Sequence, residues 1–239
     1  MFRSDPQAVT HPIAVRPPLS GLLVVAAALA LLLGVAAAYS FGTATVPLLV
    51  FGAVVMLVGY AMAHRYPHPV LGLCNAVTLT RAAMVAYLAG AVLGAASPWI
   101  VFAVAVTAFA LDGVDGWLAR RAGLCSEFGA RFDMETDAGL AAVISLWLLA
   151  SGTTGPEILV LGFMRYAFVA AAVLWPALQA PLPEMFRRKA ICVLQIAALI
   201  ILIFPLTPAG LTWPIGVTAA ILLSWSFAVD ILWLARRAA

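Results

Sequence analysis

The residues of this chain that could do chemistry are concentrated in one short segment. Four of its six aspartates lie between positions 112 and 137, in a sequence where only 10% of the residues are charged. The first two, Asp112 and Asp115, are followed by Gly116 and Ala119, at offsets of three, four and seven residues. Residues with these offsets share one face of an α-helix. The segment therefore predicts a helix that presents two carboxylates beside two small residues.

Two more aspartates lie on a second predicted helix. Gly129, Asp133 and Asp137 recur every four residues, so they also share a helical face. Only residues 121–128 separate the two predicted helices, so we expect the helices to pack antiparallel with their acidic ends together. All four carboxylates would then face one pocket.

Carboxylates gathered this closely repel one another, and they require protons, basic partners or a bound cation. The motif offers oxygen ligands, which suit a hard cation such as Mg²⁺ or Mn²⁺. Four carboxylates are enough for two ions, so the segment predicts a two-metal site for phosphoryl chemistry. Gly116, Ala119 and Gly129 would leave room for a ligand beside the acids, and tight helix packing is the alternative reading of these small residues.

The rest of the sequence is apolar enough to identify lipid as its solvent. Hydrophobic residues make up 65% of the 239 residues, whereas a soluble domain has about 45–50%. The formal net charge of +3 comes from basic residues scattered between apolar runs, which argues against nucleic-acid binding. Cys74, Cys125 and Cys192 have no CxxC or Cys/His spacing, so neither a structural zinc site nor a disulfide framework is predicted.

Eight apolar runs have lengths close to the ~20 residues that a transmembrane helix needs. They cover residues 19–39, 46–63, 77–96, 98–119, 129–151, 156–176, 189–205 and 211–234. Breaks that contain Pro, Gly or charged residues separate them. The sequence therefore predicts an all-α, polytopic membrane helical bundle.

A break at Pro67, Pro69 and Gly72 divides this bundle in two. Residues 1–70 are predicted to form an N-terminal tail and a transmembrane hairpin, and residues 71–239 a core of six helices. The hairpin residues leave its role open between an anchor, a partner surface and a lid.

Basic residues mark one side of the membrane. With the N-terminus inside, they lie at or near cytoplasmic helix ends from Arg3 to Arg237, and only Arg165 falls well inside a span. The opposite loops carry Glu157 and no Lys or Arg. Because Lys and Arg accumulate in cytoplasmic loops, we expect both termini and the acidic site to be cytoplasmic. The compact chain favours a bacterial inner (plasma) membrane.

The acidic segment fits the pattern D-x2-D-G-x2-A-R-x8-G-x3-D-x3-D at all eight fixed positions, from Asp112 to Asp137. This is the signature of the class I CDP-alcohol phosphatidyltransferases, integral membrane enzymes of phospholipid synthesis, and the chain resembles this family. The six later spans agree with the family's core, and the two N-terminal spans are extra to it. The resemblance also implies a homodimer.

The resemblance implies a reaction. A CDP-linked lipid donor binds through its diphosphate to two metal ions, an acceptor hydroxyl attacks the lipid-side phosphorus, and CMP leaves. By position, Asp112, Asp115 and Asp133 resemble the metal ligands. Asp137 resembles both a ligand and the base that deprotonates the acceptor hydroxyl.

The resemblance also implies contacts with the donor. Gly116 would let the cytidine approach the backbone, while Arg120 and Ser126 would contact the donor's nucleotide or diphosphate. Upstream, the residues Asn75, Thr78 and Arg81 resemble the family's N-x-x-T-x-x-R segment, whose polar face lines the nucleotide pocket. A helix N-terminus with an arginine that snorkels to the interface is the alternative reading.

Two further basic features are candidates. Arg165 lies within an apolar span, where an arginine faces a cavity or a partner. Many family members have an arginine in the corresponding helix, often followed by glutamate, whereas Tyr166 follows here. The cluster Arg187-Arg188-Lys189 could hold a phosphate of the acceptor or of the lipid. The excess of positive charge on the cytoplasmic side explains the cluster equally well.

Three functions are consistent with this sequence. The first is metal-dependent transfer of a phosphatidyl group from CDP-diacylglycerol to a small alcohol, free or phosphorylated, with release of CMP. The second is transfer of a phospho-alcohol head group from a CDP-alcohol to diacylglycerol. The third, from another class, is an ion-coupled transporter, because acidic residues in membranes also line ion paths. Transporter acids lie near the midplane, whereas these aspartates are predicted at helix ends, which favours an enzyme.

Overall fold

The computed structural model describes residues 16–94, 96–180 and 186–238, and within them the chain is helical with no strand. The helices are α1 (Leu19–Phe41), α2 (Thr45–Arg65), α3 (Gly72–Leu93), α4 (Pro98–Ala122), α5 (Glu127–Ala150), α6 (Ile158–Leu174), the short 3₁₀ helix η1 (Pro176–Gln179), α7 (Phe186–Ile203) and α8 (Ala209–Ala238). The predicted all-α bundle is confirmed. Most of the predicted N-terminal tail, with Arg3, lies outside the described residues, as does the side chain of Lys189.

Five of these helices are long and apolar enough to cross a membrane: α1, α2, α3, α4 and α8. The chain is therefore an integral membrane protein. Of the other three, α6 is apolar but has only 17 residues, α5 carries acidic residues in its first half, and α7 begins beside three basic residues. That all eight helices cross the membrane stays a prediction.

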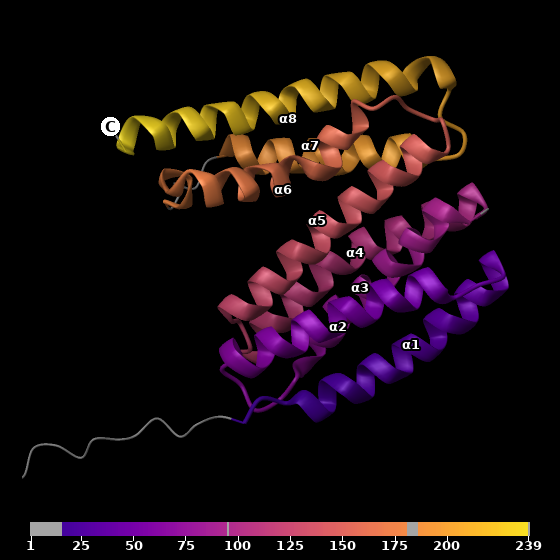
Figure 1. Cartoon of the computed structure of the whole chain (residues 1–239), viewed down its shortest axis with the longest axis vertical. Helices are drawn as coiled ribbons and strands as arrows, with labels where there is room; N and C mark the ends of the chain where they lie inside the picture. The colour runs from indigo at the N-terminus through magenta and orange to yellow at the C-terminus, as the bar shows by residue number, and fades with distance from the viewer. Residues whose placement is uncertain (1–15, 95, 181–185, 239) are drawn as a thin grey trace, which may run out of the picture.

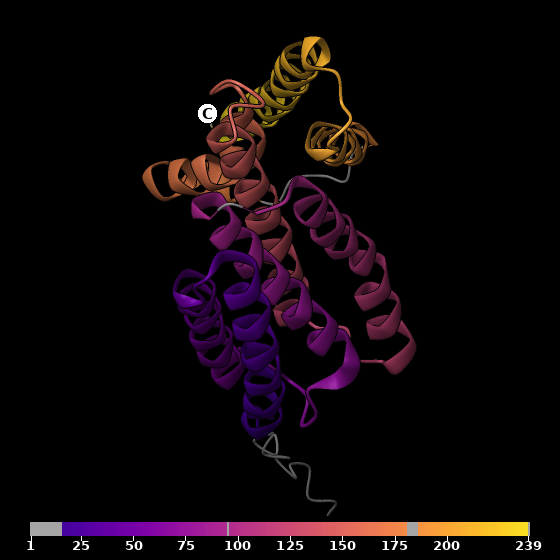
Figure 2. The same ribbon diagram turned by 90° about the vertical axis from the view of Figure 1, so that its right-hand side faces the viewer.

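Helix α3 is the centre of the first part of the bundle. It packs against α1, α2, α4 and α5, and most of its residues are buried inside the protein. Helix α5 packs on α3 and also on α6, and so connects two groups of helices. Figures 1 and 2 show α6, α7 and α8 together on one side of α5, with α1 to α4 on the other.

The N-terminal hairpin docks on α3 through small residues. A Cβ added to Gly90 would lie 2.6 Å from Cγ of Pro47, so only glycine allows this approach. Near the same end of α3, the Tyr87 hydroxyl donates a hydrogen bond of 2.7 Å to Ser40 Oγ. The hairpin is therefore in intimate contact with the helix that organises the site described below.

Local signals explain where α4 ends and α5 begins. The chain leaves α4 at Gly123, whose φ of +65° is in the left-handed region that favours glycine. Ser126 then caps α5, because its Oγ accepts a hydrogen bond of 3.0 Å from the backbone N–H of Gly129. The link between these two helices is short, so the acidic ends of α4 and α5 lie side by side.

The helices alternate in direction. Figure 1 shows the starts of α1, α3, α5 and α7 and the ends of α2, α4, α6 and α8 on the same side of the molecule. The last turns of α4 and α8 contain the pairs Arg120-Arg121 and Arg236-Arg237. Positive charge therefore collects at one end of the bundle, which supports the expected orientation. That this end is cytoplasmic stays a prediction.

Candidate active site

One buried arginine joins the four aspartates. Arg81 of α3 is completely buried, and its guanidinium lies between the acidic ends of α4 and α5. The four carboxylates therefore converge, as the helical offsets predict. The guanidinium pairs with Asp112 Oδ1 at 3.1 Å and Asp115 Oδ2 at 2.8 Å, and with Asp133 and Asp137, while its Nε donates to the carbonyl of Ala108 at 3.1 Å.

This arrangement leaves the site with excess negative charge. One guanidinium offsets only one of four carboxylates. Asp112, Asp133 and Asp137 are each 36–44% exposed at the side chain, and one oxygen from each lies within 4.8 Å of the others. An acidic, oxygen-only set that is open on one side fits a hard divalent cation.

Asp115 differs from the other three aspartates. Its side chain is only 4% exposed. Oδ2 accepts hydrogen bonds from Thr78 Oγ1 at 2.9 Å and from Arg81, and Oδ1 accepts one of 2.7 Å from the N–H of Gly116. Protein donors therefore already hold both oxygens of Asp115, and its role as a metal ligand stays a prediction.

A cavity of about 200 Å³ lies beside Asp115 and Asp133. Its walls come from α3, from the end of α4 and from the start of α5. They include seven residues that the sequence predicts to contact a ligand: Asn75, Thr78, Gly116, Ala119, Arg120, Ser126 and Gly129. The cavity thus joins the N-x-x-T segment to the acidic motif in one site.

Glycines keep this cavity open. A Cβ on Gly129 would lie 3.2 Å from Ser126 Oγ and 3.8 Å from Asn75 Oδ1, and a Cβ on Gly116 would lie 3.4 Å from Nη1 of Arg120. A side chain at Gly129 would therefore press on the residue that caps α5. Both glycines favour a ligand that approaches the backbone closely.

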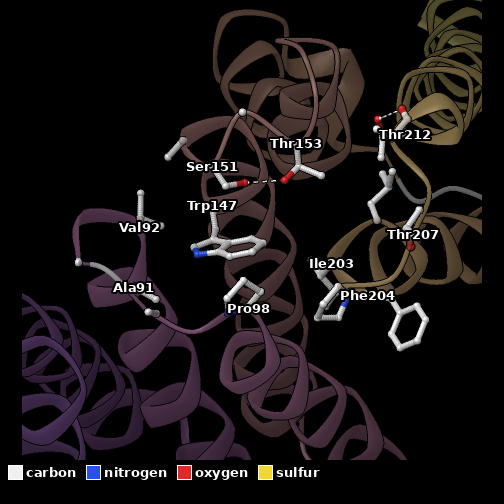
Figure 3. A pocket seen from close by; sticks show the side chains of 17 residues that line it. Ala91, Val92, Pro98, Trp147, Ser151, Thr153, Ile203, Phe204, Thr207 and Thr212 are labelled. Atoms are coloured by element: carbon white, nitrogen blue, oxygen red, sulfur yellow. Dashed lines mark hydrogen bonds between the residues drawn. The ribbon is translucent and has the colours of Figure 1, made fainter.

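A larger cavity, of about 580 Å³, lies elsewhere in the bundle, among the loops that join α3 to α4, α5 to α6 and α7 to α8. Figure 3 shows Trp147 and Pro98 on one side of it and Phe204 on the other, with Ser151 hydrogen-bonded to Thr153. Among the described residues that line it, none is acidic, basic, histidine or cysteine. Because this described lining offers no carboxylate, imidazole or thiol for metal binding or acid–base chemistry, the acidic site is the candidate active site.

Comparison with known proteins agrees with this assignment. The family model for CDP-alcohol phosphatidyltransferases matches residues 71–231, which is more than half of the chain. The chain belongs to the CDP-alcohol phosphatidyltransferase family. No curated protein and no solved structure matches it. The family transfers a phosphatidyl or phospho-alcohol group from a CDP-alcohol and generally depends on divalent metals.

Acidic side chains pair with Arg165 and Arg187, two of the basic candidates outside the motif. Arg165 of α6 pairs with Glu135 of α5 and does not line the 200 Å³ cavity. Arg187 of α7 donates to the carbonyl and the Oγ of Ser226, at 2.7 and 2.6 Å, and pairs with Asp230 of α8. Arg165 therefore links α6 to α5, and Arg187 links α7 to α8.

The N-x-x-T-x-x-R segment predicts Arg81 at the nucleotide pocket, whereas Arg81 is not among the residues that line the cavity. It contacts the aspartates instead. The sequence does carry a signal for this contact, because four carboxylates gathered together require a basic partner or a cation. Cavity residues that the sequence did not suggest are Cys74, Leu124, Cys125 and Ala130.

Proposed function

We propose that this family member transfers a phosphatidyl group from CDP-diacylglycerol to the hydroxyl of a small alcohol, free or phosphorylated, and releases CMP. One observation supports the proposal most strongly. Four aspartates from two helices converge beside a cavity that is lined by residues of the motif shared with the family. Such a site suits a ligand with a diphosphate next to a nucleoside.

Asp112, Asp133 and Asp137 would hold the divalent cations, with Asp115 as the fourth ligand. Their oxygens are close enough to share an ion, and their charge exceeds what Arg81 offsets. Two ions of Mg²⁺ or Mn²⁺ bound there supply positive charge that stabilises the diphosphate and the leaving CMP.

Asp137 is the proposed base. Its side chain is 41% exposed, so an acceptor alcohol can reach it. It takes the proton of the acceptor hydroxyl as that oxygen forms a bond to the lipid-side phosphorus. The bond from this phosphorus to the oxygen of CMP breaks, and CMP leaves with the bonding electrons. Arg120, at the wall of the cavity, would bind a phosphate of the nucleotide.

The remaining proposals follow from this reaction. The partners are CDP-diacylglycerol, a small alcohol and the lipid bilayer, and a second copy of the chain completes a homodimer. Residues 71–239 form the six-helix catalytic core, and residues 1–70 contribute the tail and hairpin. The active site faces the cytoplasm of a bacterial cell at the inner membrane.

The test is CMP release by the purified protein in detergent with Mg²⁺. CDP-diacylglycerol is supplied with glycerol 3-phosphate, inositol phosphate, serine or choline, and a parallel reaction contains CDP-choline and diacylglycerol. We expect CMP from CDP-diacylglycerol with one of the acceptors. CMP from CDP-choline and diacylglycerol alone would contradict the proposed donor and establish head-group transfer.

A further inference from the structure

The amide of Asn75 has one free group, and that group is an acceptor. Asn75 lines the 200 Å³ cavity from α3. Its Nδ2 donates to Tyr66 Oη at 2.9 Å and to the carbonyl of Leu71 at 2.6 Å, which uses both amide hydrogens. Its Oδ1 accepts no hydrogen bond from the described residues, and it lies on the side of Gly129. Oδ1 of Asn75 is therefore available to accept a hydrogen bond from a ligand in the cavity.

Tyr66 and the carbonyl of Leu71 together fix this orientation of the amide. The Tyr66 hydroxyl lies 2.9 Å from the carbonyl of Val70, to which it can only donate. Oη also lies 3.1 Å from the carbonyl of Leu71. Its single hydrogen is used on these two carbonyls, so Oη can only accept from Asn75. The carbonyl of Leu71 is also an acceptor. A reversed amide would place Oδ1 of Asn75 against two acceptors, so the network selects one orientation.

Tyr66 is held firmly in place. It is 5% exposed and lies in the segment between α2 and α3, just before the region that matches the family. Its ring packs edge-on against Phe128 at 5.2 Å and His68 at 5.4 Å between centroids. Burial raises the pKa of the Tyr66 phenol, so the hydroxyl keeps its hydrogen at neutral pH.

We propose that Tyr66 is a positioning residue that holds Asn75 Oδ1 toward the exocyclic amine of the donor's cytosine, so that the site selects cytosine over uracil. This inference rests on the proposed function. Cytosine carries an N–H donor at C4, where uracil carries a carbonyl oxygen that an acceptor repels.

The spacing along α3 suits this assignment. Asn75 precedes Arg81 by six residues, which is about 9 Å along a helix. The aspartates that would hold the phosphates gather around Arg81, so Asn75 lies more than one helical turn along α3 from that point. A nucleotide whose phosphates met the aspartates would extend its base toward Asn75.

The test compares the binding of CMP and UMP to the purified full-length protein with Mg²⁺, by isothermal titration calorimetry. Tyr66→Phe keeps the ring and its packing but removes the hydroxyl that holds the amide. We expect CMP to bind about tenfold more weakly, as for one lost hydrogen bond in a binding site, and UMP affinity to stay unchanged or rise. Asn75→Ala is expected to lower the CMP/UMP affinity ratio in the same way.

Tyr87→Phe is the matched control. It also removes a buried tyrosine hydroxyl that connects α3 to the hairpin, but at the opposite end of the helix. We expect it to leave the CMP/UMP ratio unchanged. An equal loss of CMP and UMP binding in Tyr66→Phe, or an unchanged ratio there, would overturn the inference. If the wild-type protein bound CMP and UMP equally well, the inference about Tyr66 would be wrong while the proposed function could stand. If it bound neither nucleotide, the proposed function itself would be wrong.

Discussion

At the scale of single residues, Arg81 connects helix α3 to the acidic motif. It is fully buried and contacts all four aspartates of the motif, which come from two other helices. Its charge holds these helix ends together, and it offsets only part of their negative charge. Bound divalent cations would also offset this negative charge. Folding stability and metal binding should therefore be linked through Arg81.

The first prediction concerns Arg81→Met in detergent, with unfolding followed by circular dichroism. Removal of one partner from a buried ion pair costs about 3–5 kcal/mol, so we expect a loss of this order in EDTA. In Mg²⁺ the loss should be clearly smaller, because the cations offset the carboxylates that the arginine no longer contacts.

Arg165→Met is the control for this experiment. Arg165 pairs with the single carboxylate of Glu135, and both side chains are partly exposed, at 32% and 56%. Pairs of this kind are worth about 0–1 kcal/mol, and we expect the same small change with and without Mg²⁺. If Arg81→Met lost equal stability in both conditions, the link between Arg81 and the metal site would be wrong.

At the scale of helices, the junction of α4 and α5 determines the shape of the cavity. Gly123 ends α4, Ser126 caps α5, and Gly129 leaves open the space between the cap and Asn75. The second prediction is that Gly129→Ala weakens CMP binding, because the new Cβ would lie 3.2 Å from Ser126 Oγ and narrow the cavity. We expect an affinity loss of at least about fivefold, together with up to ~1 kcal/mol of stability from the disturbed cap, measured by calorimetry and thermal unfolding.

Gly52→Ala provides the comparison for Gly129→Ala. Gly52 lies within α2, and a Cβ there would meet no described atom within 4 Å. Alanine is a better helix former than glycine by about 1 kcal/mol, so this variant should be as stable as the wild type or more stable, with unchanged CMP affinity. Equal CMP affinity in Gly129→Ala and the wild type would contradict the proposed use of the cavity.

Much of the helical arrangement could be predicted from the sequence, because apolar runs end at recognisable signals. Pro98 begins α4 where the sequence predicts a helix to begin. Helix α3 begins at Gly72, five residues before the predicted start of its span, because polar Asn75 is helical although it precedes the apolar run. The 3₁₀ helix at Pro176–Gln179 carries no clear periodicity and was not predicted.

The convergence of the aspartates could be predicted because it depends on spacing within two adjacent helices. The partners of Arg165 and Arg187 could not, because they lie 30 and 43 residues away along the chain, on other helices. The position of Arg81 likewise depends on which face of α3 meets α4 and α5. Tyr66 lies outside the recognised motif, and only the structure places its hydroxyl against Asn75.

At the scale of the whole molecule, the acidic site and the positive helix ends lie on the same side of the bundle (Figure 1). The third prediction places this side in the cytoplasm. A variant with Cys125 as its only cysteine, made by Cys74→Ala and Cys192→Ala, should react with a membrane-impermeant maleimide in inside-out vesicles and not in right-side-out ones. Cys125 is exposed at the link between α4 and α5.

The opposite side is tested by Ser151→Cys in a chain without its three native cysteines. Ser151 is exposed just after the end of α5 and close to the larger cavity. It should react in right-side-out vesicles alone. The reverse pattern for the two variants would show that the active site faces away from the cytoplasm.

The central claim is that a metal-bound carboxylate site transfers a phosphatidyl group with Asp137 as the base. The most direct measurement is CMP release from CDP-diacylglycerol by the wild type, Asp137→Asn and Glu135→Gln, each in Mg²⁺ and in EDTA. Glu135 lies on the same helix but pairs with Arg165, so Glu135→Gln controls for loss of a carboxylate. We predict CMP release only with the metal, with near wild-type turnover in Glu135→Gln. Asp137→Asn should fold but release CMP about 10²–10⁴-fold more slowly. Full turnover in EDTA, or a fully active Asp137→Asn enzyme, would contradict the account.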